Sequence, residues 1–196
     1  MSKTRPPFTA ALTRRAALAG LAISLASPAF AAGTDAAVAY MGRVAKDMLA
    51  AHRQATVASF KRAILRHADV ATIADYSLGQ YRAKLNPAQR QAYYSGTATF
   101  MARYFADQSR DYVVSKYEIG NADQDGSDIN VNTKVYLING QSYTVVWRLS
   151  PAGGGYKVED AKVMGFSLIY LQRGIFTSFL AKRDGDVSQL VAALNR

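Results

Sequence analysis

Hydrophobic positions follow two different periods along the chain, and the change between them comes at Asp111. Between residues 35 and 110 apolar side chains recur every three to four positions, the spacing of one face of an amphipathic helix. Between residues 111 and 166 they alternate with polar side chains, which is typical of strands buried on one side. The helical spacing then returns over residues 167–181 and in a last short segment to Leu194. The pattern therefore predicts helices, then strands, then helices.

Three helices are expected in the first part of the chain. One runs over residues 35–68, and Asp69 is a good N-cap for a second, which ends at Gly79. Asn86-Pro87 begins the third, because proline is favoured at the first helical position, and this helix runs to about Arg110. Its broad apolar face is formed by Tyr93, Tyr94, Phe100, Met101, Tyr104 and Phe105.

Four sequential strands are expected between residues 111 and 166. Asn139-Gly140 predicts a tight hairpin between the second and third, because both central residues of a type I′ turn need a positive φ. Strands that follow one another through short turns form an antiparallel meander. We therefore expect an α+β fold, in which helices cover one face of a curved antiparallel four-stranded sheet.

The first 31 residues have the composition of an export signal. Four basic residues and no acidic one precede an apolar run over residues 16–26, and Ala29-Phe30-Ala31 provides an A-x-A cleavage site. This run is shorter than the roughly 20 residues that cross a bilayer. We expect cleavage after Ala31, with a retained membrane anchor as the alternative. Thr13-Arg14-Arg15 also resembles a twin-arginine signal, so the export route stays open.

The domain that we expect after this signal spans residues 32–196 and carries its positive charge in one half. The whole chain has a net charge of +10, and the loss of four basic residues with the signal leaves +6. Residues 32–110 hold 11 basic and 5 acidic side chains, whereas residues 111–196 hold 9 of each. We expect the first half to meet an anionic membrane or an acidic partner rather than nucleic acid, with solubility alone as the alternative. The candidate contact residues are Lys61, Arg62, Arg66, Arg82, Lys84 and Arg90.

Catalytic chemistry finds little support in the residue types present. The chain has no cysteine, and its two histidines, His52 and His67, stand among charged neighbours where solvated imidazoles are expected. Glu159 and Asp160 are adjacent on an expected strand, so they should point to opposite faces and not act as a pair. The acidic residues between 123 and 128 fit a turn rather than a calcium loop. We expect no enzyme activity, no metal and no cofactor.

Aromatic side chains are abundant, with 12 Tyr, 8 Phe and 1 Trp. They fall mostly on the surfaces where the helices and the sheet should face one another. Either the two layers pack into an ordinary core, or they fail to close and leave an apolar cavity. Periodicity is the same in both cases, so it does not choose between them.

Two segments resemble the MlaC family, also called the toluene-tolerance auxiliary family. The first is Asp69-Val70-Ala71-Thr72-Ile73-Ala74-Asp75-Tyr76-Ser77-Leu78-Gly79, followed by Tyr81 and by Leu85-Asn86-Pro87-Ala88-Gln89-Arg90. The second is Gly165-Phe166-Ser167-Leu168, followed by Arg173, Phe176, Gly185-Asp186-Val187 and Leu190. The order and spacing of these motifs extend the resemblance over about residues 35–195.

The resemblance implies a periplasmic phospholipid-binding shuttle with an NTF2/cystatin-like cone. Members of the family carry lipid between an outer-membrane lipoprotein complex and an inner-membrane complex of an MCE-domain protein with an ABC-type permease. A sister branch is associated with hopanoids, so a sterol-like lipid is an alternative cargo. Two other functions stay open: an NTF2-like isomerase or hydratase on a hydrophobic substrate, which needs a buried carboxylate or histidine such as Asp160 or His67, and a structural adaptor with a filled core.

Helical and strand parity, together with the resemblance, predict the residues that would line a lipid slot. They come from the long helix, from the inner face of the sheet and from the C-terminal helix: Phe100, Met101, Tyr104, Phe105, Val131, Val135, Val145, Trp147, Leu168, Ile169 and Phe176.

Overall fold

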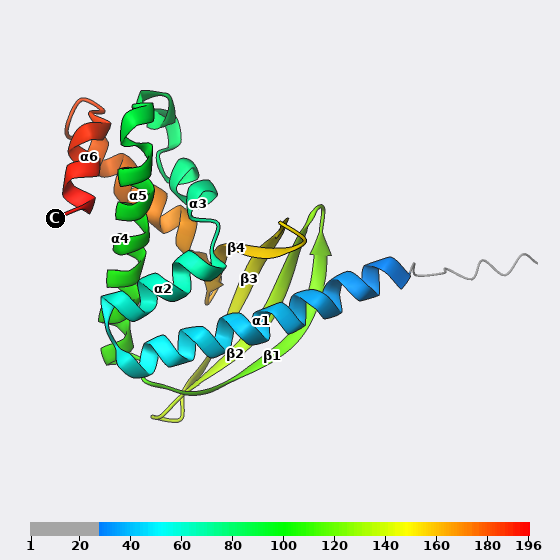
Figure 1. The fold of residues 1–196 in the computed structure, drawn as a ribbon. Helices are drawn as coiled ribbons and strands as arrows, with labels where there is room; N and C mark the ends of the chain where they lie inside the picture. The colour runs from blue at the N-terminus through cyan, green and yellow to red at the C-terminus, as the bar shows by residue number, and fades with distance from the viewer. Residues whose placement is uncertain (1–27) are drawn as a thin grey trace, which may run out of the picture.

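The computed structural model describes residues 28–196, so the expected export signal lies almost wholly outside the described residues (Figure 1). Helices come first, a sheet follows, and helices end the chain, in the order that the sequence predicts. The helices are α1 (Pro28–Gln54), α2 (Val57–His67), α3 (Val70–Ser77), α4 (Arg90–Asp111), α5 (Leu168–Ala181) and α6 (Val187–Leu194), with short 3₁₀ helices η1 (Gly79–Lys84) and η2 (Pro87–Gln89). The strands are β1 (Val114–Asp125), β2 (Asp128–Leu137), β3 (Ser142–Ala152), β4 (Gly155–Val163) and β5 (Phe166–Ser167).

The first expected helix is in fact two helices, separated at Ala55. This residue has a positive φ of 50°, which ends α1. Thr56 then caps α2, and its side-chain oxygen accepts a hydrogen bond from the backbone N–H of Ser59 at 3.1 Å. The apolar spacing continues through this break, so the pattern predicted one helix where the chain turns.

The sheet has five antiparallel strands in the order β1-β2-β3-β4-β5, one more than expected. The additional strand, β5, has two residues, too few for an alternating pattern to show. The register places Val131 opposite Trp147 and Thr133 opposite Val145 on the inner face of β2 and β3. A bulge at Glu159 interrupts the pairing of β3 with β4, because Arg148 pairs with Asp160 whereas Leu149 pairs with Val158.

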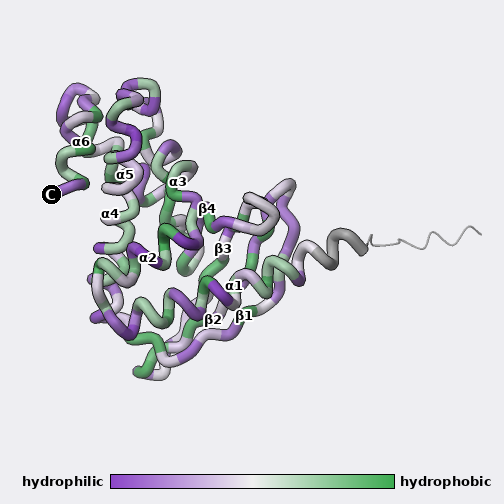
Figure 2. Tube along the Cα trace, viewed as in Figure 1, coloured by the Kyte–Doolittle hydropathy of each residue, from purple (hydrophilic) through white to green (hydrophobic). Residues whose placement is uncertain are grey.

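The helices form two groups around the sheet. In Figure 1, α1 runs along one face of the sheet, whereas α3 to α6 stand together beside it and α2 lies between the two groups. One core lies between α1 and the sheet, and a separate core lies among α3, α4, α5 and α6. The hydropathy colouring in Figure 2 changes repeatedly along the helices and strands, as expected for elements that are apolar on one side only. A third core, formed by α1, α2 and α4, joins the two groups of helices.

Candidate binding site

Two adjoining apolar cavities lie between the sheet and the helices, with volumes of about 260 and 330 Å³. The first is bounded by α1, α2, β4, the middle of α4 and the start of α5. The second is bounded by α1, the last turns of α4, the inner face of β2 and β3, and the end of β4. The two share a wall formed by Met48, Tyr104, Phe105, Trp147, Ala161 and Leu168. Hydrophobic side chains make up most of both linings.

Nine of the eleven residues predicted for a slot lie in the walls of these cavities. Phe100, Met101 and Ile169 line the first, Val135 and Val145 line the second, and the shared residues named above line both. The structure therefore brings together side chains from α4, the sheet and α5, as parity suggested.

Val131 and Phe176 lie outside both cavities. Val131 is fully buried in the core between α1 and the sheet. Phe176 is buried in the core of α3 to α6, where its ring contacts that of Phe100 with centroids 5.1 Å apart. Parity places both residues on an inner face, but it does not say which parts of that face are closed by a neighbouring element.

Several lining residues were not singled out by the sequence. Met48 of α1 belongs to both cavities, and Leu171 and Ile175 of α5 form part of the first. Met48 follows Val44 at helical spacing, which does indicate an inward position. The same spacing fits the core beneath α1, so the sequence offered no reason to assign Met48 to a cavity.

His67 is not the solvated imidazole that we expected, because it is 7% exposed and lines the first cavity. Its Nε2–H donates to Oδ2 of Asp47 at 2.8 Å, and Arg66 donates to the same oxygen at 2.9 Å. The hydrogen bond with His67 is the main cause that holds the pKa of the Asp47 carboxyl below its usual value. His67 therefore ties α2 to α1 at the edge of the cavity.

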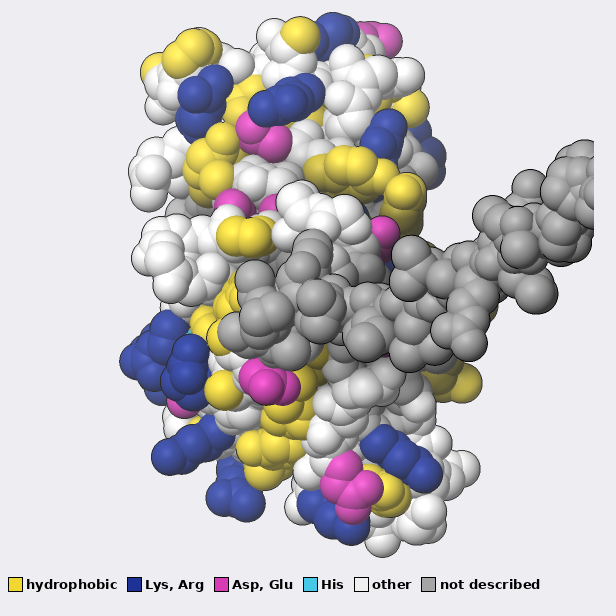
Figure 3. Space-filling view, turned by 90° about the vertical axis from the view of Figure 1, so that its right-hand side faces the viewer, with side chains coloured by type: hydrophobic (Ala, Val, Ile, Leu, Met, Phe, Trp, Pro, Cys, Tyr) yellow, Lys and Arg dark blue, Asp and Glu magenta, His cyan; other side chains and the backbone are white. Residues whose placement is uncertain are grey.

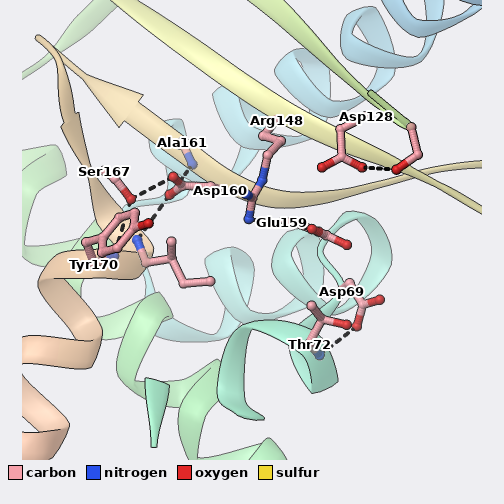
Figure 4. A network of polar contacts seen from close by, with 11 residues as sticks. Asp69, Thr72, Asp128, Arg148, Glu159, Asp160, Ala161, Ser167 and Tyr170 are labelled. Atoms are coloured by element: carbon pink, nitrogen blue, oxygen red, sulfur yellow. Dashed lines mark hydrogen bonds and ion pairs between the residues drawn. The ribbon is translucent and has the colours of Figure 1, made fainter. Parts of the chain in front are cut away.

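Asp160 is 6% exposed and also lines the first cavity, yet three donors already occupy its carboxylate (Figure 4). The Ser167 hydroxyl donates to it at 2.6 Å, and the backbone N–H groups of Ala161 and Ile169 donate at 2.8 and 3.1 Å. Ser167 is itself the N-cap of α5 and accepts from the N–H of Tyr170 at 3.3 Å. Asp160 thus fixes the start of α5 against β4, where a negative charge favours the helix N-terminus.

Glu159 and Asp160 both line the first cavity, although strict alternation would place only one of them there. The bulge at Glu159 is the reason, since it breaks the strict alternation of side chains along β4. Glu159 faces Arg148, with their charged groups 3.5 Å apart. Each carboxylate therefore has a partner of its own.

His52 is half-buried in the second cavity rather than solvated. Its Nε2 accepts a hydrogen bond from the backbone N–H of Val114 at 3.0 Å, so the neutral ring is the form that fits. Burial lowers the pKa of His52 below its ordinary value.

The basic residues predicted for partner contact have varied surroundings. Lys61 donates to Ser95 and Thr99 of α4 at 3.2 and 2.8 Å, and Arg62 donates to Gln54 at 3.3 Å. Arg82 pairs with Asp75 at 2.8 Å, and Lys84 donates to the carbonyl of Asp184 at 3.2 Å. Arg82 and Arg90 also border a shallow hollow beside η1. In the face that Figure 3 shows, the Lys and Arg side chains are spread over the surface in separate groups.

No cluster of three His, Cys, Asp or Glu side chains suited to a metal ion occurs within residues 28–196. Among the helices of the same residues, none combines the length and hydropathy that a membrane span requires. The candidate site therefore consists of apolar walls with a few hydrogen-bonded polar groups among them.

A model of the MlaC protein family matches residues 35–196. The chain belongs to the MlaC family. No curated protein matches the sequence. Among solved structures, a phospholipid-binding protein from Ralstonia solanacearum, determined in complex with a phospholipid, shares the fold of this MlaC-family chain with a TM-score of 0.65. The two sequences are 21% identical, and the likeness covers 80% of this chain and 93% of the other.

Proposed function

We propose that this MlaC-family protein is a periplasmic shuttle that carries phospholipid between the outer and inner membranes. The observation that carries this proposal is the pair of adjoining apolar cavities with a shared wall. A concave apolar site with a few polar groups at its edge is the usual form of a small-molecule binding site. The phospholipid bound by the Ralstonia solanacearum protein of the same fold supports this class of ligand.

Two cavities suit a lipid with two chains. One acyl chain would occupy each cavity, and the headgroup would stay near solvent. Transfer of each methylene from water to an apolar site contributes about 0.8 kcal/mol, so two chains supply ample binding energy. The rigid fused rings of a hopanoid would not divide between two cavities, which favours a two-chain lipid over the sterol-like alternative.

The transport role rests on the family and on the N-terminal pattern. In this proposal residues 1–31 direct export and residues 32–196 form the lipid-binding domain, as the soluble component of an ABC-type lipid transport system. Its partners would be the inner-membrane MCE-domain and permease complex and an outer-membrane lipoprotein complex. The carrier must also release its cargo, so a partner must favour a conformation that binds lipid less tightly.

An isomerase or hydratase with a hydrophobic substrate is the second candidate, because Asp160 and His67 are buried at the first cavity. Acid–base catalysis needs a group that is free to take up a proton from the substrate. The Asp160 carboxylate already accepts three hydrogen bonds, and the Nε2–H of His67 is donated to Asp47. These bonds favour structural roles for both residues and hence the carrier.

Mass spectrometry of organic extracts from the purified protein tests the proposal. We expect diacyl phospholipid at about one molecule per protein. A single-chain fatty acid or a hopanoid in the extract would contradict it. Incubation of the protein with vesicles of labelled phosphatidylethanolamine, followed by separation of protein from vesicles, distinguishes an empty binding protein from one that binds no phospholipid.

A further inference from the structure

Five of the eleven exposed large hydrophobic side chains in residues 28–196 line the two cavities. Tyr104, Leu171 and Ile175 are half exposed and line the first, whereas Tyr104, Tyr112 and Met164 are exposed and line the second. Phe166, which lines neither cavity, is 68% exposed next to Met164, which is 72% exposed. Large exposed apolar groups that lie together mark an interaction surface rather than ordinary surface variation.

The turn from β4 to β5 is the most prominent part of this rim. Met164 and Gly165 have positive φ angles of 51° and 87°, so the chain reverses sharply between Val163 and Phe166. A Cβ atom added at Gly165 would meet nothing within 4 Å, so this side of the turn faces open space. Met164 and Phe166 therefore project from a narrow tip.

The charge of the same segment fits an anionic surface. Residues 161–175, which include the turn and the exposed part of α5, contain Lys162 and Arg173 and no acidic residue. Cations beside exposed aromatic and aliphatic groups are typical of segments that lie in the interface of an anionic bilayer. The α4 side of the mouth is neutral, because Arg103 and Arg110 are matched there by Asp107 and Asp111.

We propose that the rim formed by Tyr104, Tyr112, Met164, Phe166, Leu171 and Ile175 docks directly on an anionic phospholipid surface. This inference rests on the proposed function, since the rim continues into the cavity walls at Tyr104, Leu171 and Ile175. A rim pressed into the headgroup region removes water from between the bilayer and the cavity. An acyl chain then passes from the membrane to the cavity along apolar surface throughout.

Co-sedimentation of the protein with vesicles of phosphatidylethanolamine and phosphatidylglycerol measures this docking, and phosphatidylcholine vesicles serve as the neutral comparison. The variants Phe166→Ser and Leu171→Ser should each weaken binding by about five- to tenfold, because each removes apolar area that the membrane buries. Leu65→Ser is the matched control, because Leu65 is 52% exposed, close to the 50% of Leu171, but lines neither cavity. All variants keep the same N-terminus, so its contribution cancels.

The proposal is supported if the two rim variants bind the anionic vesicles more weakly than the wild type and Leu65→Ser does not. It is overturned if the wild-type protein does not sediment with vesicles, if Leu65→Ser weakens binding as much as Leu171→Ser, or if Phe166→Ser leaves binding unchanged. The proposal is also overturned if the rim variants bind vesicles normally but transfer lipid more slowly to a membrane protein partner. That result would assign the rim to the partner. The phospholipid content of the purified protein reports separately on the proposed function, since Phe166 lines neither cavity.

Discussion

Trp147 on β3 lies directly opposite Val131 on β2, yet the two side chains have different surroundings. Val131 is fully buried in the core beneath α1. Trp147 packs against the edge of that core and lines both cavities. The boundary between the closed core and the cavities therefore falls within a single cross-strand pair.

The first prediction uses this boundary. Val145→Trp adds an indole in the second cavity, where it should occupy the space of an acyl chain, so we expect a folded protein without lipid. Val131→Trp makes the same change in a closed core, where overpacking typically costs about 1–3 kcal/mol. Lipid phosphorus per mole and the thermal midpoint after delipidation measure the two effects. A Val145→Trp protein that unfolds as readily as Val131→Trp, with lipid still bound to the folded fraction, would argue against the cavity assignment.

The second prediction concerns the carboxylate at the start of α5. Asp160→Ala leaves the N–H groups of Ala161 and Ile169 without their acceptor, which should lower the free energy of unfolding by about 1–3 kcal/mol. Glu159→Gln is the control from the same cavity wall, because the charged groups of Glu159 and Arg148 are 3.5 Å apart and the loss of this long ion pair should matter little. Urea unfolding of both variants makes the comparison. Unchanged stability in Asp160→Ala would show that the carboxylate does not stabilise the fold. That result would favour a catalytic role, as in the isomerase or hydratase alternative.

The third prediction separates two neighbouring basic residues of α2. Lys61→Glu should destabilise the protein by about 1 kcal/mol or more, because Lys61 joins α2 to Ser95 and Thr99 of α4. Arg62→Glu should leave stability unchanged, because Arg62 is exposed. If the basic half of the chain meets an anionic membrane or acidic partner, Arg62→Glu slows lipid delivery at low salt while the bound lipid stays in place. Equal delivery rates for wild type and Arg62→Glu at low salt would assign the charge at this position to solubility.

The fourth prediction is a dependence of stability on pH through His52. Burial lowers the pKa of His52 in the folded protein, so the unfolded chain binds more protons below the ordinary value of about 6.5. The contribution of the neutral ring is therefore complete above that pH and is lost as the pH falls toward the lowered pKa. His52→Gln keeps an acceptor for Val114 without a titrating group, so its thermal midpoint should fall less than that of the wild type between about pH 7 and pH 5. Parallel curves for the two proteins over this window would disprove the role of His52.

Local sequence signals were reliable where a structural feature depends on a few neighbouring residues. Asp69 caps α3, and Asn86 caps the turn that begins at Pro87. Each of these caps is a hydrogen bond between a side chain and a backbone N–H two or three residues later, so its determinants lie within a short segment. For the same reason the alternating pattern identified the long strands.

The sequence did not predict features that involve very few residues or that lie within an uninterrupted hydrophobic pattern. The break at Ala55 interrupts a helical spacing that itself continues, and the two residues of β5 are too few to alternate. Strict alternation assigned Glu159 and Asp160 to opposite faces of the sheet. Because of the bulge at Glu159, both residues line the first cavity. Pairing with a neighbouring strand decides such features, and one sequence does not contain that information in local form.

By itself the sequence determined which side of each helix and strand is apolar, and hence the α+β architecture and most of the side chains that face inward. Only the tertiary structure decided that Val131 and Phe176 lie in closed cores whereas Val135, Val145 and Trp147 line a cavity. The physical reason is that burying a side chain in a core and placing it on a cavity wall both require the same apolar residues at the same period. What separates the two outcomes is whether an opposing layer approaches closely enough to fill the space, and the distance between layers is set by the packing of α1 on the sheet and of α4 on α5 and α6.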